Sequence, residues 1–84
     1  MATDLTKEAL EGRSVVAGAA KANPYLFSSP CWMAWEAGYE LRGMSDILSV
    51  HSSRGYSVRV ETREGGKFRI RFEGAKLRPQ IDRT

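Results

Sequence analysis

The spacing of apolar side chains in residues 4–20 predicts a first helix. Apolar and small residues recur there at intervals of three and four, as on one face of an amphipathic helix. The residues of this face are Leu5, Ala9, Gly12, Val16, Ala19 and Ala20. Because they are small, we expect a partner helix to pack closely against them. Asp4 or Thr3 can cap this helix, and Asn23-Pro24 would end it, since proline disfavours helical geometry in the preceding residue.

A second helix is predicted from Pro30 to about Leu48, unless Gly43 ends or bends it earlier. Ser29 is a natural N-cap, and proline at the first helical position loses no hydrogen bond. Two apolar stripes run along this helix. The first consists of Met33, Ala37, Leu41, Met44 and Leu48, and the second of Trp32, Trp35 and Tyr39. A helix that is apolar on two faces is typically sandwiched between two other elements.

Strict alternation of apolar and polar residues then predicts two strands, at 56–62 and 67–72. Tyr56, Val58 and Val60 share one face of the first strand, and Phe68, Ile70 and Phe72 share one face of the second. The turn between them contains Gly65-Gly66, a pair that favours a tight hairpin. Residues 47–52 could form a third strand. The tail at 75–84 has no periodicity, and we expect it to fray.

These elements predict a single α+β domain over residues 1–84. An αα-hairpin at 4–48 would pack on a C-terminal antiparallel β-hairpin at 53–74, or on a three-stranded meander, followed by a flexible tail. A chain of 84 residues with 42 % hydrophobic residues fits one globular domain.

The composition favours a cytoplasmic protein without catalytic machinery. No apolar run approaches the ~18 residues that span a membrane, and the N-terminus lacks a secretory signal. Cys31 is the single cysteine and His51 the single histidine. One of each cannot form a metal site, and no nucleophile motif surrounds them. We therefore expect no catalytic residue, no metal, no cofactor and no small-molecule substrate.

The charge is strongly asymmetric along the chain. Residues 1–52 hold four lysines and arginines against six acidic residues, a net charge of −2, whereas residues 53–84 hold nine against four, a net charge of +5. A basic half suggests an anionic partner such as RNA, DNA or an acidic protein surface. The candidate nucleic-acid-binding residues are Arg59, Lys67, Arg69, Arg71 and Arg78. The alternative is that basic side chains only solvate the hairpin and block aggregation at its edge.

The aromatic stripe of Trp32, Trp35 and Tyr39 has two interpretations. Tryptophan and tyrosine dominate protein–protein hot spots, so the stripe could be a partner-binding patch. Alternatively, these side chains form core between the second helix and its neighbours.

Two helices rich in small residues, joined through Pro-Tyr and followed by Trp-x-x-Gly-aromatic, resemble the ribosome modulation factor family of small bacterial proteins. The matching residues, within 8–43, are Gly12, Gly18, Pro24, Tyr25, Trp35, Gly38 and Tyr39. The resemblance implies a helix–loop–helix that binds the small ribosomal subunit and promotes inactive ribosome dimers. A second branch of the family is described as acting on an antibiotic.

This chain departs from the family pattern in its charge. The ribosome-binding members are basic in their helices, whereas the helical half here is acidic and a basic hairpin follows it. We therefore expect a binding protein that contacts ribosomal or other RNA through the hairpin, with the helices as scaffold. The alternative is a protein–protein module that uses the aromatic stripe, either as a phage or mobile-element inhibitor or as a homodimer.

Overall fold

The computed structural model describes residues 3–16, 18–43 and 46–83. Within these residues the chain forms two helices and one four-stranded antiparallel sheet, which confirms the α+β class. The elements are α1 Thr6–Arg13, α2 Pro30–Glu40, β1 Ile47–Ser53, β2 Ser57–Thr62, β3 Lys67–Glu73 and β4 Arg78–Arg83. No helix of the described part of the chain is both long enough and apolar enough to cross a membrane.

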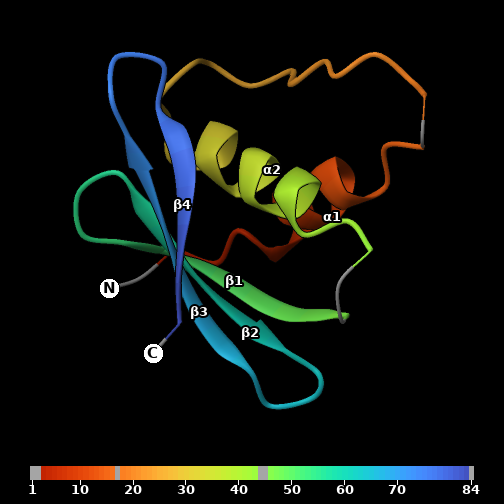
Figure 1. Cartoon of the computed structure of the whole chain (residues 1–84), viewed down its shortest axis with the longest axis vertical. Coiled ribbons are helices and arrows are strands. Elements are labelled where there is room, and N and C mark those ends of the chain that lie inside the picture. The colour runs from red at the N-terminus through yellow and green to blue at the C-terminus, as the bar shows by residue number, and fades with distance from the viewer. Residues whose placement is uncertain (1–2, 17, 44–45, 84) are drawn as a thin grey trace.

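The sheet is a meander in which each strand pairs with the next along the chain, in the order β1-β2-β3-β4 (Figure 1). The predicted hairpin corresponds to β2–β3, and the third strand that residues 47–52 could form corresponds to β1. The expectation that the tail frays is wrong, because β4 continues the sheet. Gly74 and Leu77 both adopt positive φ and turn the chain back, and the Leu77 side chain is buried. Ile81 then pairs with Ile70 on β3.

The edge of the sheet formed by β1 is covered by another segment of the chain. The N-terminal segment runs along the outer edge of β1: Thr3 accepts a hydrogen bond from the Ser52 N–H at 3.0 Å, and the Leu5 N–H donates to Val50 at 2.8 Å. Asp4 forms an isolated bridge with His51 between these two bonds. The segment thus caps the β1 edge, which would otherwise expose unpaired backbone groups.

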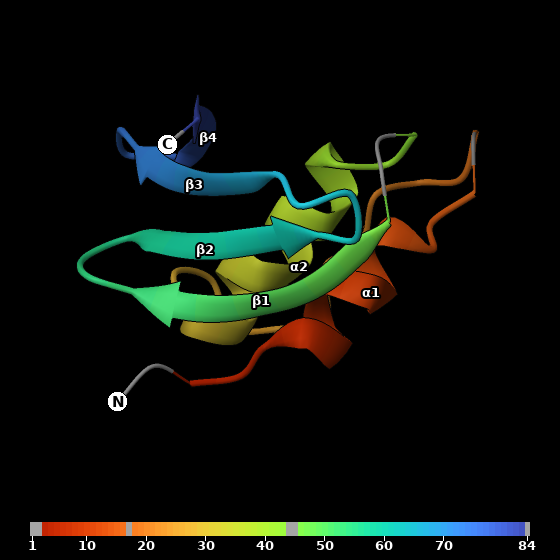
Figure 2. The same cartoon turned by 90° about the horizontal axis from the view of Figure 1, so that it is seen from below.

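Both helices lie on one face of the sheet (Figure 2). α2 crosses this inner face, and α1 packs beside α2 and against β1. The core between the layers is apolar. It contains Met33, Ala37 and Leu41 from α2 and Val50, Val58, Val60, Ile70 and Phe72 from the sheet. The opposite face of the sheet, here called the outer face, is not covered by either helix.

The two helices touch backbone to backbone. A Cβ added at Gly38 would lie 2.7 Å from the carbonyl carbon of Ala9 and closer still to its oxygen, and one at Gly12 would lie 2.9 Å from the carbonyl carbon of Trp35. Each helix therefore places a glycine against a carbonyl group of the other. The predicted close packing of a small-residue face is confirmed.

Both helices are shorter than the pattern predicted. α1 ends at Arg13 rather than near Ala20, because beyond Gly12 its predicted face meets no partner layer: Val16 is 70 % exposed, and Gly18 adopts a φ of 86°. Helices of this length depend on packing for their stability.

α2 begins as predicted and ends early. Ser29 caps it, accepting a hydrogen bond from the Trp32 N–H, and Pro30 is the first residue. The helix stops at Glu40, Gly43 adopts a φ of 81°, and β1 begins at Ile47. Leu48 therefore lies on a strand and is exposed. Met44, assigned to the same stripe, lies outside the described residues.

Asn23-Pro24-Tyr25 fastens the connection between the helices rather than ending α1. The Asn23 side chain donates to the Trp32 carbonyl and to the Glu36 carboxylate, both at 3.0 Å, and accepts from the Tyr25 N–H at 3.0 Å. Lys21 forms an ion pair with the same carboxylate, so Glu36 is compensated although it is only 4 % exposed. A buried carboxylate is stable only when it is paired in this way.

Tyr25 completes this fastening on the other helix. Its hydroxyl donates a hydrogen bond to the Glu11 carboxylate on α1, and this bond raises the pKa of Tyr25 from 10.0 to about 12. The segment thus joins the connection to α2 through Asn23 and to α1 through Tyr25.

Replacing Gly38 with alanine should lower the free energy of unfolding by about 1–3 kcal/mol, because the new methyl group collides with the Ala9 carbonyl. At an ordinary helical position the same change stabilises by about 1 kcal/mol, so the sign of the effect is diagnostic. Urea unfolding followed by tryptophan fluorescence measures it, and Gly12→Ala should act in the same direction. A variant more stable than the wild type would contradict the backbone contact.

Tyr25→Phe should lower the free energy of unfolding at neutral pH, and this effect should disappear at strongly alkaline pH. Since the folded-state pKa lies above the unfolded value, the contribution of Tyr25 is complete below pH 10 and is lost as the pH rises towards about 12. The difference in unfolding free energy between wild type and Tyr25→Phe should therefore shrink over that interval. Tyr56→Phe, at an exposed turn residue, is the control and should leave the wild-type profile unchanged. A constant difference across the interval would refute the Tyr25–Glu11 bond.

Candidate nucleic-acid interface

The outer face of the sheet collects the polar side chains of the central strands. Val58, Val60 and Ile70 point into the core, so the residues between them point the opposite way. β2 contributes Arg59 and Glu61 to the outer face, and β3 contributes Lys67, Arg69 and Arg71.

The strand register places two arginines directly opposite each other at the centre of this face. Arg59 on β2 pairs with Arg69 on β3, and the same row continues to His51 on β1 and Asp82 on β4. Like charges in opposite positions destabilise a sheet. Among the described residues neither guanidinium has an ion-pair partner, and the Arg69 Nε is buried without a hydrogen bond. We call these two residues the arginine pair.

Arg71, two residues further along β3, contrasts with the arginine pair. Its Nε donates to Asp82, its Nη2 lies 3.3 Å from the second oxygen of the same carboxylate, and its Nη1 donates to Glu73 at 2.9 Å. The hydrogen bond to Asp82 is the main reason that the pKa of Arg71 is raised. Its charge is thus already neutralised within the fold.

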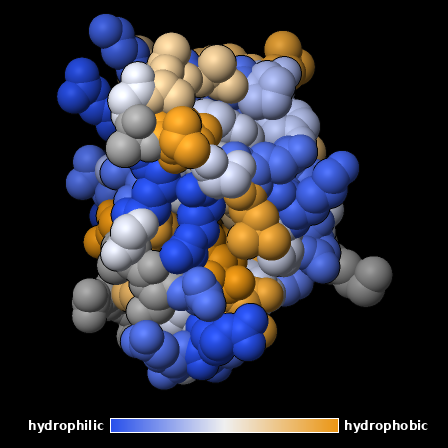
Figure 3. Space-filling view, turned by 90° about the vertical axis from the view of Figure 1, so that its right-hand side faces the viewer, coloured by the Kyte–Doolittle hydropathy of each residue, from blue (hydrophilic) through white to orange (hydrophobic). Residues whose placement is uncertain are grey.

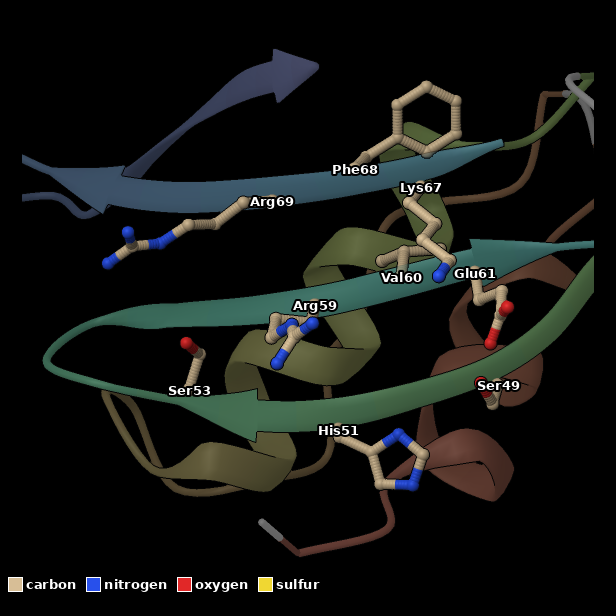
Figure 4. A pocket seen from close by; sticks show the side chains of 9 residues that line it. All are labelled: Ser49, His51, Ser53, Arg59, Val60, Glu61, Lys67, Phe68 and Arg69. Carbon is tan, nitrogen blue, oxygen red and sulfur yellow. The ribbon is translucent and has the colours of Figure 1, made fainter. Parts of the chain in front are cut away.

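The arginine pair borders an open hollow in the outer face, with a volume of about 660 Å³. Figure 4 shows its lining side chains, which come from β1, β2 and β3. They are Ser49, His51, Ser53, Arg59, Val60, Glu61, Lys67, Phe68 and Arg69. In Figure 4, Glu61 and Ser49 lie at one end, Arg69 and Ser53 at the other, and Arg59 between them.

Three of the five cations singled out in the sequence come together at this hollow: Arg59, Lys67 and Arg69. Arg71 shares the face but is ion-paired, and Arg78 lies opposite Glu73 at the start of β4, outside the hollow. The residues that sequence reasoning did not assign to the site are Ser49, His51, Ser53 and Glu61. For the residues on β1, the available signal was that Ser49, His51 and Ser53 are polar and occupy alternate positions around buried Val50, so that they could be expected to face outward.

The aromatic stripe lies largely within the fold. Trp35 is 3 % exposed and stacks on Tyr39 with 5.6 Å between ring centroids, and the Arg42 guanidinium lies over the Tyr39 ring at 3.7 Å from its centroid. Trp32 makes an edge-to-face contact with Phe72 on β3, with 5.9 Å between the ring centroids. Trp35 therefore lies in the core, and Trp32 joins the helical layer to the sheet.

Several apolar side chains on the helical side are exposed. Val16, Leu26 and Phe27 in the connection between the helices are exposed. Figure 3 views the molecule from the side on which α1 lies in Figure 1, and its hydrophobic patches are separated by hydrophilic side chains. Single exposed apolar residues are ordinary on protein surfaces.

The described residues contain no cluster of histidine, cysteine, aspartate and glutamate that could hold a metal ion. The Cys31 thiol lies 3.7 Å from the Glu8 carboxylate, and burial together with this carboxylate raises its pKa. A raised pKa disfavours the reactive thiolate.

Comparison with protein-family models, with curated proteins and with solved structures finds no match for this chain. What the outer face can bind is therefore inferred from its own charges, register and shape.

Arg59→Gln should leave the fold unchanged or stabilise it by about 0.2–1 kcal/mol at low salt, because it removes a like-charge cross-strand contact. The gain should diminish at high salt, where exposed charges are screened. Arg71→Gln removes the same charge and should destabilise, since Asp82 and Glu73 lose their partner. Thermal unfolding of both variants tests this contrast. Equal destabilisation by the two substitutions would mean that Arg59 is satisfied in the fold.

Proposed function

We propose that this chain is a small, non-catalytic, cytoplasmic binding protein that contacts RNA through the outer face of its sheet. The observation that carries the proposal is the arginine pair: two arginines in directly opposite strand positions on an uncovered face, without a carboxylate partner among the described residues. Two adjacent cations without such partners destabilise the sheet, and an anionic ligand would relieve this repulsion.

Phosphate is the anion that suits this arrangement. A guanidinium binds phosphate oxygens through two parallel hydrogen bonds, and arginine is enriched where planar recognition of phosphate is needed. Neighbouring strands lie about 4.8 Å apart, so the arginine pair can engage one phosphate or two successive phosphates. Lys67, at the next outward position on β3, extends the same basic surface.

The resemblance of residues 8–43 to ribosome modulation factors favours ribosomal RNA as the target. The proposed binding surface differs from that of the family, in which the helices bind, because the helices here carry the acidic half of the chain. Gly12 and Gly38, two of the resembling residues, serve the contact between the helices, and Tyr25 fastens their connection. The helical pair then acts as the scaffold that holds the sheet.

The alternative, a protein–protein module that uses the aromatic stripe, has less support. Trp35 is buried, and the Tyr39 ring stacks on Trp35 and lies under the Arg42 guanidinium and the Lys21 ammonium. A hot spot needs large aromatic area that a partner can cover.

RNA binding should be strongly salt-dependent and should require the arginine pair. If Arg59, Lys67 and Arg69 each contact a phosphate, affinity should fall roughly 20- to 40-fold between about 50 and 200 mM salt. Arg59→Gln and Arg69→Gln should each weaken binding about tenfold at the lower salt and flatten the salt dependence. Fluorescence anisotropy with a labelled ribosomal RNA fragment measures both effects.

Lys7→Gln is the matched control, because Lys7 is an exposed cation on α1, in the layer on the far side of the sheet. It should leave affinity within about twofold of the wild type. Binding that is independent of salt, or that Lys7→Gln weakens as much as Arg59→Gln, would refute the outer face as the interface.

A further inference from the structure

The hollow in the outer face has two chemically different ends. The arginine pair supplies cationic donors alone, whereas Glu61, two residues beyond Arg59 on β2, supplies an acceptor beside Lys67. Of the described residues that line the hollow, Glu61 is the single carboxylate. The register sets it between Ser49 on β1 and Lys67 on β3.

Glu61 forms an opposite-charge cross-strand pair with Lys67, but a carboxylate adds nothing to a surface that only attracts phosphate. It contributes to binding if the ligand carries a hydrogen-bond donor next to its phosphate. Two residues along a strand span about 6.6 Å, so the phosphate and the donor must belong to neighbouring groups of one compact unit. Ribose is such a neighbour, and acidic side chains are used elsewhere to accept hydrogen bonds from ribose hydroxyls.

The size of the hollow agrees with a unit of this kind. Sites for small ligands occupy roughly 300–1,000 Å³, and the hollow has about 660 Å³. It is open rather than enclosed, so a nucleic-acid strand could pass through it.

Resting on the RNA-binding function proposed above, we propose that the hollow holds one ribonucleotide unit and selects RNA over DNA. The phosphate lies on Arg59 and Arg69, and the 2′-hydroxyl donates to Glu61, with the Ser49 hydroxyl beside it. The 2′-hydroxyl is the group by which a protein distinguishes RNA from DNA at a given position.

The test compares an RNA with a DNA of the same base sequence, using uracil in both, and with the 2′-O-methyl RNA. Wild-type protein should bind the RNA at least about tenfold more tightly than the other two, because only the RNA offers a hydroxyl donor. In Glu61→Thr, which is too short to reach the hydroxyl, this preference should fall to about twofold or less, whereas Glu61→Gln, whose amide oxygen still accepts a hydrogen bond, should keep part of it. Affinity for the DNA should rise in both variants as the repelling charge is removed.

Glu64→Gln is the matched control, because Glu64 is an exposed carboxylate in the β2–β3 turn and does not line the hollow. It removes the same charge and should keep the wild-type preference for RNA. Thermal melting confirms that each variant is folded. Two Glu61 variants are compared because a larger loss of preference in Glu61→Thr than in Glu61→Gln, with Glu64→Gln unaffected, separates loss of the acceptor from a general charge effect.

The ribonucleotide unit could come from a strand or from a free nucleotide, and competition distinguishes these sources. Uridine and adenosine 5′-monophosphates that displace labelled RNA, while their 2′-deoxy forms do not, support the hollow as a site for the free unit. Displacement by oligoribonucleotides alone supports the same site on a strand.

Equal affinity of the wild type for RNA and DNA overturns the inference, as does a preference that follows base identity rather than the sugar. If the loss of affinity in Arg59→Gln and Arg69→Gln persists in that case, the outer face remains a nucleic-acid interface and only the role of Glu61 fails. Absence of any RNA binding removes the proposed function itself.

Discussion

The backbone contact between the two helices is the constraint on which the rest of the structure depends. Gly12 and Gly38 each lie against a carbonyl group of the facing helix, where no side chain can be accommodated. This brings α1 close enough to share one face of the sheet with α2. The connection between the helices is then fixed by the contact of Asn23 with α2 and by the contact of Tyr25 with α1. Both helices of the described residues lie on the inner face, so the outer face is accessible to solvent or to a ligand.

Charge on that outer face is distributed unevenly, and this unevenness is the physical basis for the functional proposal. Arg71 is neutralised by Asp82 and Glu73, which shows that the sheet can satisfy an arginine in its own ladder. Arg59 and Arg69, in the adjacent row, are placed against each other instead. Proteins commonly give up some stability at the positions they use for binding.

Much of the fold could be predicted from local pattern. The β2–β3 hairpin follows from alternation and its glycine turn, the start of α2 from Ser29-Pro30, and the close helix contact from small residues. The end of α1 could not be predicted, because the apolar spacing continues past Gly12 while the partner layer does not. β4 was missed because Pro79 and its charged neighbours hide the alternation, and because its order comes from pairing with β3.

The candidate site was predictable in composition but not in arrangement. Alternation alone identifies Arg59, Lys67 and Arg69 as outward-facing. Cross-strand register, which the sequence does not display, decides that Arg59 opposes Arg69 while Arg71 finds Asp82. The contribution of β1 depends likewise on its pairing with β2, which brings Ser49 and His51 beside Glu61 and Arg59.

The central claim is that the sheet binds and the helices support it. Nuclear magnetic resonance titration of the labelled protein with an RNA oligonucleotide tests it most directly, through the arginine Nε–H signals and the backbone amides. The account predicts that the Nε–H signals of Arg59 and Arg69 shift or broaden first, with β1–β3 amides, while those of Arg71 and the α1 and α2 amides stay in place. Changes centred on Tyr25, Trp35 and Tyr39, with the Arg59 and Arg69 signals unaffected, would contradict it.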